Sequence, residues 1–133
     1  MVKSIWIAED DADDRMIIKE AFEENFYQNQ ISFFEDGESV LLKIKNQTED
    51  TPIDFPSLLI LDLNMPKVNG LELLKLVKKG EKTRHIPVVI LTTSKNKMDM
   101  EKVKDLGADD FITKPNSFDL MLKITKELIE KYG

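Results

Sequence analysis

Short apolar runs alternate with amphipathic segments along the whole chain, and this alternation restricts the fold more than any other feature. Five runs have the length and composition of strands, the second being the weakest candidate: SIWIA (4–8), ISFF (31–34), LLIL (58–61), VVIL (88–91) and DFIT (110–113). The segments between them repeat apolar residues at helical spacing, as Ile18, Ala21 and Phe22 do. Strands that alternate with helices form a parallel sheet covered by helices on both faces. The sequence therefore predicts an α/β fold.

Residues typical of helix ends support this division of the chain. Asp36 opens the second helical segment, Gly107 follows the fourth, and Ser117 suits the N-cap of the last. The polar segment 46–57, which holds two prolines, is interpreted as a surface loop. We find no repeat and no linker, and expect one domain over residues 1–133. Right-handed crossovers leave few topologies, and we predict the flavodoxin-like, doubly wound (βα)5 parallel sheet with strand order 2-1-3-4-5.

The composition excludes several classes of function. The chain carries 19 Lys and Arg against 25 Asp and Glu, a net charge of −6, and its basic residues are not clustered, so nucleic acid is not an expected partner. Cysteine is absent, which excludes disulfides, thiol catalysis and thiolate metal ligands. The uncharged stretch between Lys3 and Glu9 is too short for a signal peptide, and no later run has transmembrane length. We therefore expect a cytoplasmic protein that does not bind membranes.

Polar residues directly follow four of the predicted strands. They are Glu9, Asp10 and Asp11 after the first strand, Asp62 after the third, Thr92 and Thr93 after the fourth, and Lys114 and Pro115 after the fifth. Because parallel strands all end at the same edge, these side chains should meet at the carboxyl edge of the sheet, where open α/β folds bind ligands. Adjacent strands lie about 4.8 Å apart, so neighbouring strand ends can hold one small ligand.

The residue types at this edge predict a phosphoryl-transfer site. Asp10 and Asp62 would repel each other unless the pair binds a proton or a cation. With oxygen donors only, the expected cation is Mg²⁺ before Ca²⁺. Lys114 and the hydroxyl of Thr92 are suited to bind a phosphoryl group, and an aspartate can be the nucleophile that forms an aspartyl-phosphate. The sequence therefore predicts that Asp62 is phosphorylated.

Simpler interpretations exist for single residues. Asp13 and Asp14 are interpreted as acids that favour the first turn of a helix. His85 precedes the fourth strand, away from the carboxyl edge, and is expected to be exposed to solvent rather than to relay phosphate. Taken singly, Asp62 could begin a turn and Thr92 could be an ordinary strand-end residue. It is the joint placement by four separate segments that favours a functional site.

At these residues the chain closely resembles the receiver domain of two-component response regulators. The motifs that carry the resemblance are IAEDD, LILDLNMPKVNG, VVILTTS and ITKP, and the match runs nearly end to end. The resemblance implies that Asp62 accepts a phosphoryl group from the phosphohistidine of a sensor histidine kinase or a histidine phosphotransfer protein. It also implies that Asp10, Asp62 and the backbone carbonyl of Asn64 ligate Mg²⁺, and that Glu9 acts mainly through water.

The same resemblance implies a two-state switch. Lys114 would contact the phosphoryl group, and its bond to Pro115 would be cis. Thr92 would turn toward the phosphoryl oxygen while Phe111, at the aromatic switch position, swings inward. The two movements would change the face built by the fourth helix, the fifth strand and the fifth helix. That face would bind a downstream protein target and is a candidate homodimer interface.

The position of the chain end adds an expectation about organisation. The chain stops at Gly133, directly after the last predicted helix, so we expect a stand-alone receiver that catalyses only its own phosphorylation and dephosphorylation. The enlarged loop at 46–57 resembles that of stand-alone receivers, some of which pair with phytochrome-type kinases. We therefore expect a phytochrome-type kinase as one candidate partner.

Two other functions on related folds are weighed against this one. A haloacid-dehalogenase-like Mg²⁺-dependent phosphatase usually needs a second acid two residues after its nucleophile, where this chain has Asn64. A flavodoxin-like cofactor carrier needs a phosphate-binding loop after the first strand, but the sequence here is EDDADD, whose charges would repel a phosphate. A receiver that has lost phosphorylation is disfavoured because the residue set is complete.

Overall fold

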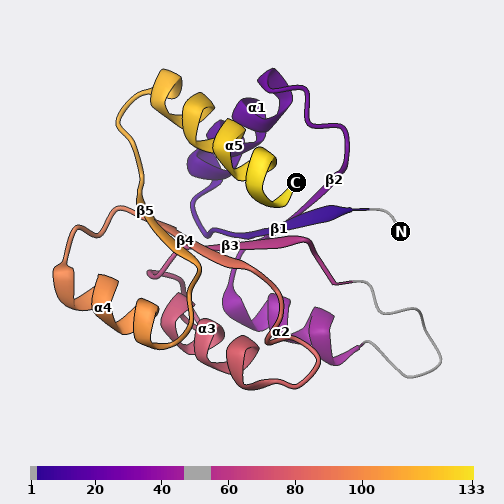
Figure 1. The fold of residues 1–133 in the computed structure, drawn as a ribbon, viewed down its shortest axis with the longest axis vertical. Coiled ribbons are helices and arrows are strands. Elements are labelled where there is room, and N and C mark those ends of the chain that lie inside the picture. Colours follow the sequence, from indigo (N-terminus) through magenta and orange to yellow (C-terminus); the bar gives the residue numbers. More distant parts are fainter. Residues whose placement is uncertain (1–2, 47–54) are drawn as a thin grey trace.

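A computed structural model describes residues 3–46 and 55–133 of the chain, and their centre is a parallel sheet. Its strands lie in the order β2-β1-β3-β4-β5, as predicted (Figure 1). Their bounds are β1 Ser4–Ala8, β2 Gln30–Phe34, β3 Leu58–Leu61, β4 Val88–Thr92 and β5 Asp110–Thr113. The fold is the predicted flavodoxin-like one, and the strand bounds differ from the predicted ones by at most one residue. The predicted loop 46–57 falls mostly on residues 47–54, which lie outside the described residues.

Helices cover both faces of the sheet. Their bounds are α1 Ala12–Glu24, α2 Gly37–Lys45, α3 Gly70–Lys79, α4 Lys97–Asp105 and α5 Phe118–Tyr132. Figure 1 shows α1 and α5 together on one face, and α2, α3 and α4 on the other. Among the described residues, no helix combines the length and apolarity that crossing a bilayer requires.

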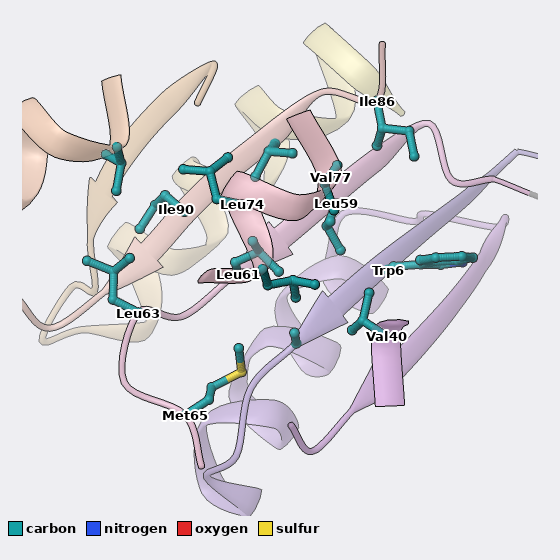
Figure 2. Packing of buried hydrophobic residues seen from close by; sticks show 14 residues of the cluster. Trp6, Val40, Leu59, Leu61, Leu63, Met65, Leu74, Val77, Ile86 and Ile90 are labelled. Atoms are coloured by element: carbon teal, nitrogen blue, oxygen red, sulfur yellow. The ribbon is translucent and has the colours of Figure 1, made fainter. Parts of the chain in front are cut away.

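The core consists of two apolar layers, one on each face of the sheet. Successive residues of β1 point to opposite faces, so Ile5 and Ile7 pack with Phe22 of α1, whereas Trp6 packs with Val40 of α2. Figure 2 shows the second layer, in which side chains of β1, β3 and β4 meet those of α2 and α3. Each large side chain buried in this way contributes about 1.5–3 kcal/mol. A sheet buried on both faces explains why its strands read as continuous apolar runs.

Helix ends follow the predicted chemistry, with one unexpected residue. Asp36 and Ser117 accept backbone hydrogen bonds as the N-caps of α2 and α5. Gly107 ends α4 at a φ of 100°, a left-handed conformation that suits glycine. The hydrogen bonds that close α1 match those that close α4 at Gly107: Phe26 N–H donates to Glu23 O, and Tyr27 N–H donates to Phe22 O. Here, however, the left-handed position (φ 59°) is held by Phe26.

Candidate functional site

The ends of β1, β3, β4 and β5 bring the predicted side chains to one place. Backbone hydrogen bonds continue the sheet past the strands: Asp62 N–H donates to Ala8 O (3.1 Å) and Lys114 N–H to Thr92 O (2.7 Å). Glu9 is fixed in the same way, because its N–H donates to Phe34 O (2.9 Å). The apolar runs thus place each polar side chain that follows them at the carboxyl edge.

The ammonium group of Lys114 is the centre of this site. It donates hydrogen bonds to Asp62 Oδ2 (2.9 Å) and to Asp14 Oδ2 (2.8 Å), and it forms an ion pair with Glu9 Oε1. Only 10% of the Lys114 side chain is exposed. Burial by itself would lower the pKa of Lys114, but the hydrogen bonds to these three carboxylates outweigh burial and raise it. Lys114 is therefore positively charged at any physiological pH.

A cluster of three carboxylates lies beside the ammonium. One oxygen each of Glu9, Asp10 and Asp62 lies within 4.8 Å of the others. Burial raises the pKa of Glu9 to about 7; hydrogen bonds from Lys114 and from Asp11 N–H oppose this rise, and the charge of Asp62 adds to it. A set of hard oxygen donors with excess negative charge fits a divalent cation such as Mg²⁺.

The loop after β3 holds the second oxygen of Asp62. Asn64 N–H donates to Asp62 Oδ1 (3.2 Å), so both oxygens of this carboxylate have partners. Asp62 is 7% exposed, whereas Asn64 is exposed. The nucleophile expected from the sequence is thus held in a fixed orientation but still reaches the surface.

Thr92 and Phe111 lie on neighbouring strands next to this site. Thr92 is fully buried, and its Oγ1 accepts a hydrogen bond from Ser94 N–H (3.4 Å). Phe111 is half-buried and packs against the apolar layer under α4. It also lines a groove of about 360 Å³ between α4 and β5, together with Met100, Val103 and Ala108. The structure therefore leaves space beside the aromatic ring.

The bond between Lys114 and Pro115 corrects one expectation. Every peptide bond of the described residues is trans, this one included, so the expected cis bond is wrong. The intrinsic preference of an X-Pro bond for the trans form is only about 0.5–1 kcal/mol, and the resemblance that suggested cis does not fix the isomer.

Sequence reasoning missed two residues of the site. The sequence places Asp14 only in the first turn of α1, but its carboxylate also binds Lys114. Arg15 donates from Nη1 to Glu9 O (2.8 Å) and so braces the strand end. One feature of the sequence could have indicated both residues: the helical segment begins at Ala12, directly after the acidic residues that end the first strand. The first turn of α1 therefore stays at the carboxyl edge. His85 is exposed, as expected.

Known proteins resemble this chain along most of its length. The family model of the response regulator receiver domain matches residues 5–126. A probable methanogenesis regulatory protein of Methanothrix harundinacea, FilR2, is 35% identical over 128 residues, which cover 96% of this chain and 81% of that protein.

Solved structures give the same result. The phosphorylated cyanobacterial phytochrome response regulator RcpA is 30% identical, with a TM-score of 0.89 and coverage of 99% of this chain and 94% of that one. The Mn²⁺-bound form of response regulator Rcp1, known from Synechocystis, is 28% identical, with a TM-score of 0.84 and coverage of 95% and 91%. On the family match, the shared fold and these relatives, the chain belongs to the response regulator receiver domain family.

Proposed function

We propose that this chain is a signalling module that is phosphorylated on Asp62. The observation that carries the proposal is the environment of this side chain at the end of β3. One of its oxygens accepts from Lys114 and the other from Asn64 N–H, and the carboxylates of Glu9 and Asp10 lie beside it. A phosphoryl group on Asp62 would therefore lie between a cation site and an ammonium.

Asp10 and Asp62 would hold Mg²⁺ together with the backbone carbonyl of Asn64, and Glu9 would contribute mainly through water. When bound, the cation neutralises negative charge on the phosphoryl oxygens. The donor set of this chain contains only oxygen, and a relative is known in a Mn²⁺-bound form. Both facts support a hard divalent cation at this place.

The phosphoryl donor would be a phosphohistidine on a sensor histidine kinase or a phosphotransfer protein. A carboxylate oxygen of Asp62 forms a bond to phosphorus while the bond from phosphorus to the histidine nitrogen breaks, and the imidazole leaves. Lys114 pairs with a phosphoryl oxygen, and the fixed orientation of Asp62 aligns the attack. The description of RcpA as a phytochrome response regulator supports a phytochrome-type kinase as the partner class.

The response would be carried by Thr92 and Phe111. The Thr92 hydroxyl would turn from Ser94 N–H toward the phosphoryl group, and Phe111 would move inward past the groove beside α4. Only Val103 of α4 is buried, which supports a movable helix. The face formed by α4, β5 and α5 would then bind a downstream protein or a second copy of the chain.

The test is incubation with acetyl phosphate and Mg²⁺, followed by intact mass measurement. The wild-type protein should gain the mass of one phosphoryl group, while Asp62→Asn and the metal-free sample should gain none. Asp10→Asn should be phosphorylated much more slowly because it binds Mg²⁺ weakly, and Lys114→Ala should fold but be impaired. Asp105→Asn, an exposed acid at the end of α4, is the matched control and should behave as wild type. Phosphorylation of Asp62→Asn at the wild-type rate would refute the proposal.

A further inference from the structure

We propose that Asp14 is a positioning residue that keeps the Lys114 ammonium at the site while Glu9 and Asp62 turn toward a divalent cation. The inference rests on the proposed function, since it concerns the same metal site. It concerns a residue outside the cluster of Glu9, Asp10 and Asp62, with a carboxylate that the proposed reaction does not otherwise use.

The ammonium of Lys114 has three carboxylate partners. A lysine has three N–H donors, and three carboxylates pair with Lys114: those of Glu9, Asp14 and Asp62. Two of these three also belong to the carboxylate cluster, and Asp14 does not. Asp14 is also the most exposed of the three, at 34% against 3% for Glu9 and 8% for Asp62. It therefore binds the ammonium from the solvent side.

The cation and the ammonium compete for the same oxygens. When Glu9 and Asp62 direct oxygens to a divalent cation, their attraction for Lys114 weakens, and the cation itself repels the ammonium. Asp14 offers a charge-assisted hydrogen bond away from the cluster, so Lys114 can give up its other partners and still stay at the site. Without Asp14 the ammonium has only the carboxylates of Glu9 and Asp62 as partners, and it competes with the cation for them.

The local structure fixes Asp14 in this position. Asp11 caps α1 and accepts hydrogen bonds from the backbone N–H groups of Asp13 (2.8 Å) and Asp14 (3.1 Å). The first helical turn is therefore held against the strand end. Asp13 belongs to the same turn and carries the same charge, but it is exposed and is not one of the three carboxylates that pair with Lys114. Asp13 is thus a matched control.

The experiment measures Mn²⁺ binding to the unphosphorylated protein from the EPR signal of the free ion. Asp14→Asn should raise the dissociation constant about fivefold to tenfold, because Lys114 then competes with Mn²⁺ for its ligands. Asp13→Asn removes an exposed charge from the same turn and should raise it less than about twofold. An equal effect of the two substitutions would overturn the proposal. Asp14→Ser should reproduce Asp14→Asn, and thermal melts of the metal-free proteins confirm that the variants are folded.

A second arm separates an action through Lys114 from a direct attraction of the cation by Asp14. In a Lys114→Met background the competing ammonium is gone, so adding Asp14→Asn should change the dissociation constant less than about twofold. An undiminished effect in this background would overturn the proposal. Failure of the wild-type protein to bind Mn²⁺ would refute the metal site of the proposed function and this inference with it. Normal wild-type binding and phosphorylation, with Asp14→Asn equal to Asp13→Asn, would refute only the inference.

Discussion

Gly70 is the first residue of α3, and it packs directly against the backbone of the predicted phosphoacceptor. A Cβ atom added here would lie 2.1 Å from Asp62 O and 2.8 Å from both Asp62 C and Leu63 Cα. Real Cβ atoms essentially never approach other heavy atoms closer than 3.0 Å, and all three neighbours are backbone atoms. Gly70→Ala should therefore push α3 away from the end of β3.

The expected losses of stability and of phosphorylation rate follow from this geometry. The carbonyl of Asp62 must retreat by about 1 Å, and overpacking of this kind costs about 1–3 kcal/mol. A loss of stability in Gly70→Ala would indicate the clash, because alanine is otherwise more stable than glycine in a helix by about 0.5–1 kcal/mol. Since a displacement of about 1 Å in a reacting group can cost about 100-fold in rate, phosphorylation by acetyl phosphate should slow by about 10-fold to 100-fold.

Two measurements on the same variant test this reasoning. Urea denaturation followed by circular dichroism gives the free energy of unfolding, and intact mass against time gives the rate of phosphorylation. Lys75→Ala, on the exposed side of the same helix, is the control and should change neither quantity appreciably. A Gly70→Ala protein as stable as wild type and phosphorylated at the same rate would show that the close approach to Asp62 does not constrain the site.

Three further outcomes are expected. Phe26→Gly should raise the free energy of unfolding in urea by about 0.5–1 kcal/mol: Phe26 is 85% exposed, and its left-handed conformation costs an L-residue about 1–2 kcal/mol, which the larger conformational entropy of unfolded glycine offsets in part. A loss of stability would contradict this. Glu9 binds its proton more tightly in the folded protein, with a pKa of about 7 against an ordinary 4.5, so metal-free stability should fall as pH rises between these values. The stability lost should reach about 3 kcal/mol in the wild-type protein and be absent in Glu9→Gln. If urea titrations showed the same change in stability between pH 5 and pH 8 for both proteins, this expectation would be refuted. Asn25→Ala should destabilise by about 1–2 kcal/mol in the same assay, because Asn25 Nδ2 links α1 to Leu122 O (2.9 Å) and Thr125 Oγ1 (2.7 Å) of α5; an unchanged urea midpoint would count against this.

The sequence predicts the sheet and the carboxyl edge well because both depend on local patterns. A strand buried on both faces must be apolar throughout, so the first polar residue after it, such as Asp62, marks where the strand ends. Parallel pairing then places Glu9, Asp62 and Lys114 at one edge without further information. One of the two edge strands, β2, is partly exposed and gives the weakest strand signal in the sequence. The roles of these residues in phosphoryl transfer stay predictions.

Features that depend on the packing of distant segments were not predictable. The hydrogen bond of Asp14 to Lys114 joins residues 100 positions apart, and it depends on how the first turn of α1 lies against the end of β5. The approach of Gly70 to Asp62 depends on the path of the loop after β3. The trans bond before Pro115 was missed because the intrinsic energy difference between the isomers is small.

The shallow anchoring of α4 has a consequence for how such a protein can diverge. Val103 is the one buried residue of this helix, whereas α3 buries four residues and α5 three. Substitutions at the other positions of α4 remove little buried surface, and exposed positions usually change stability by less than about 0.5 kcal/mol. The outer side chains of α4 can therefore be replaced by mutation almost independently of the core, so the proposed binding face can change its specificity among descendants of one ancestral chain while the fold stays the same.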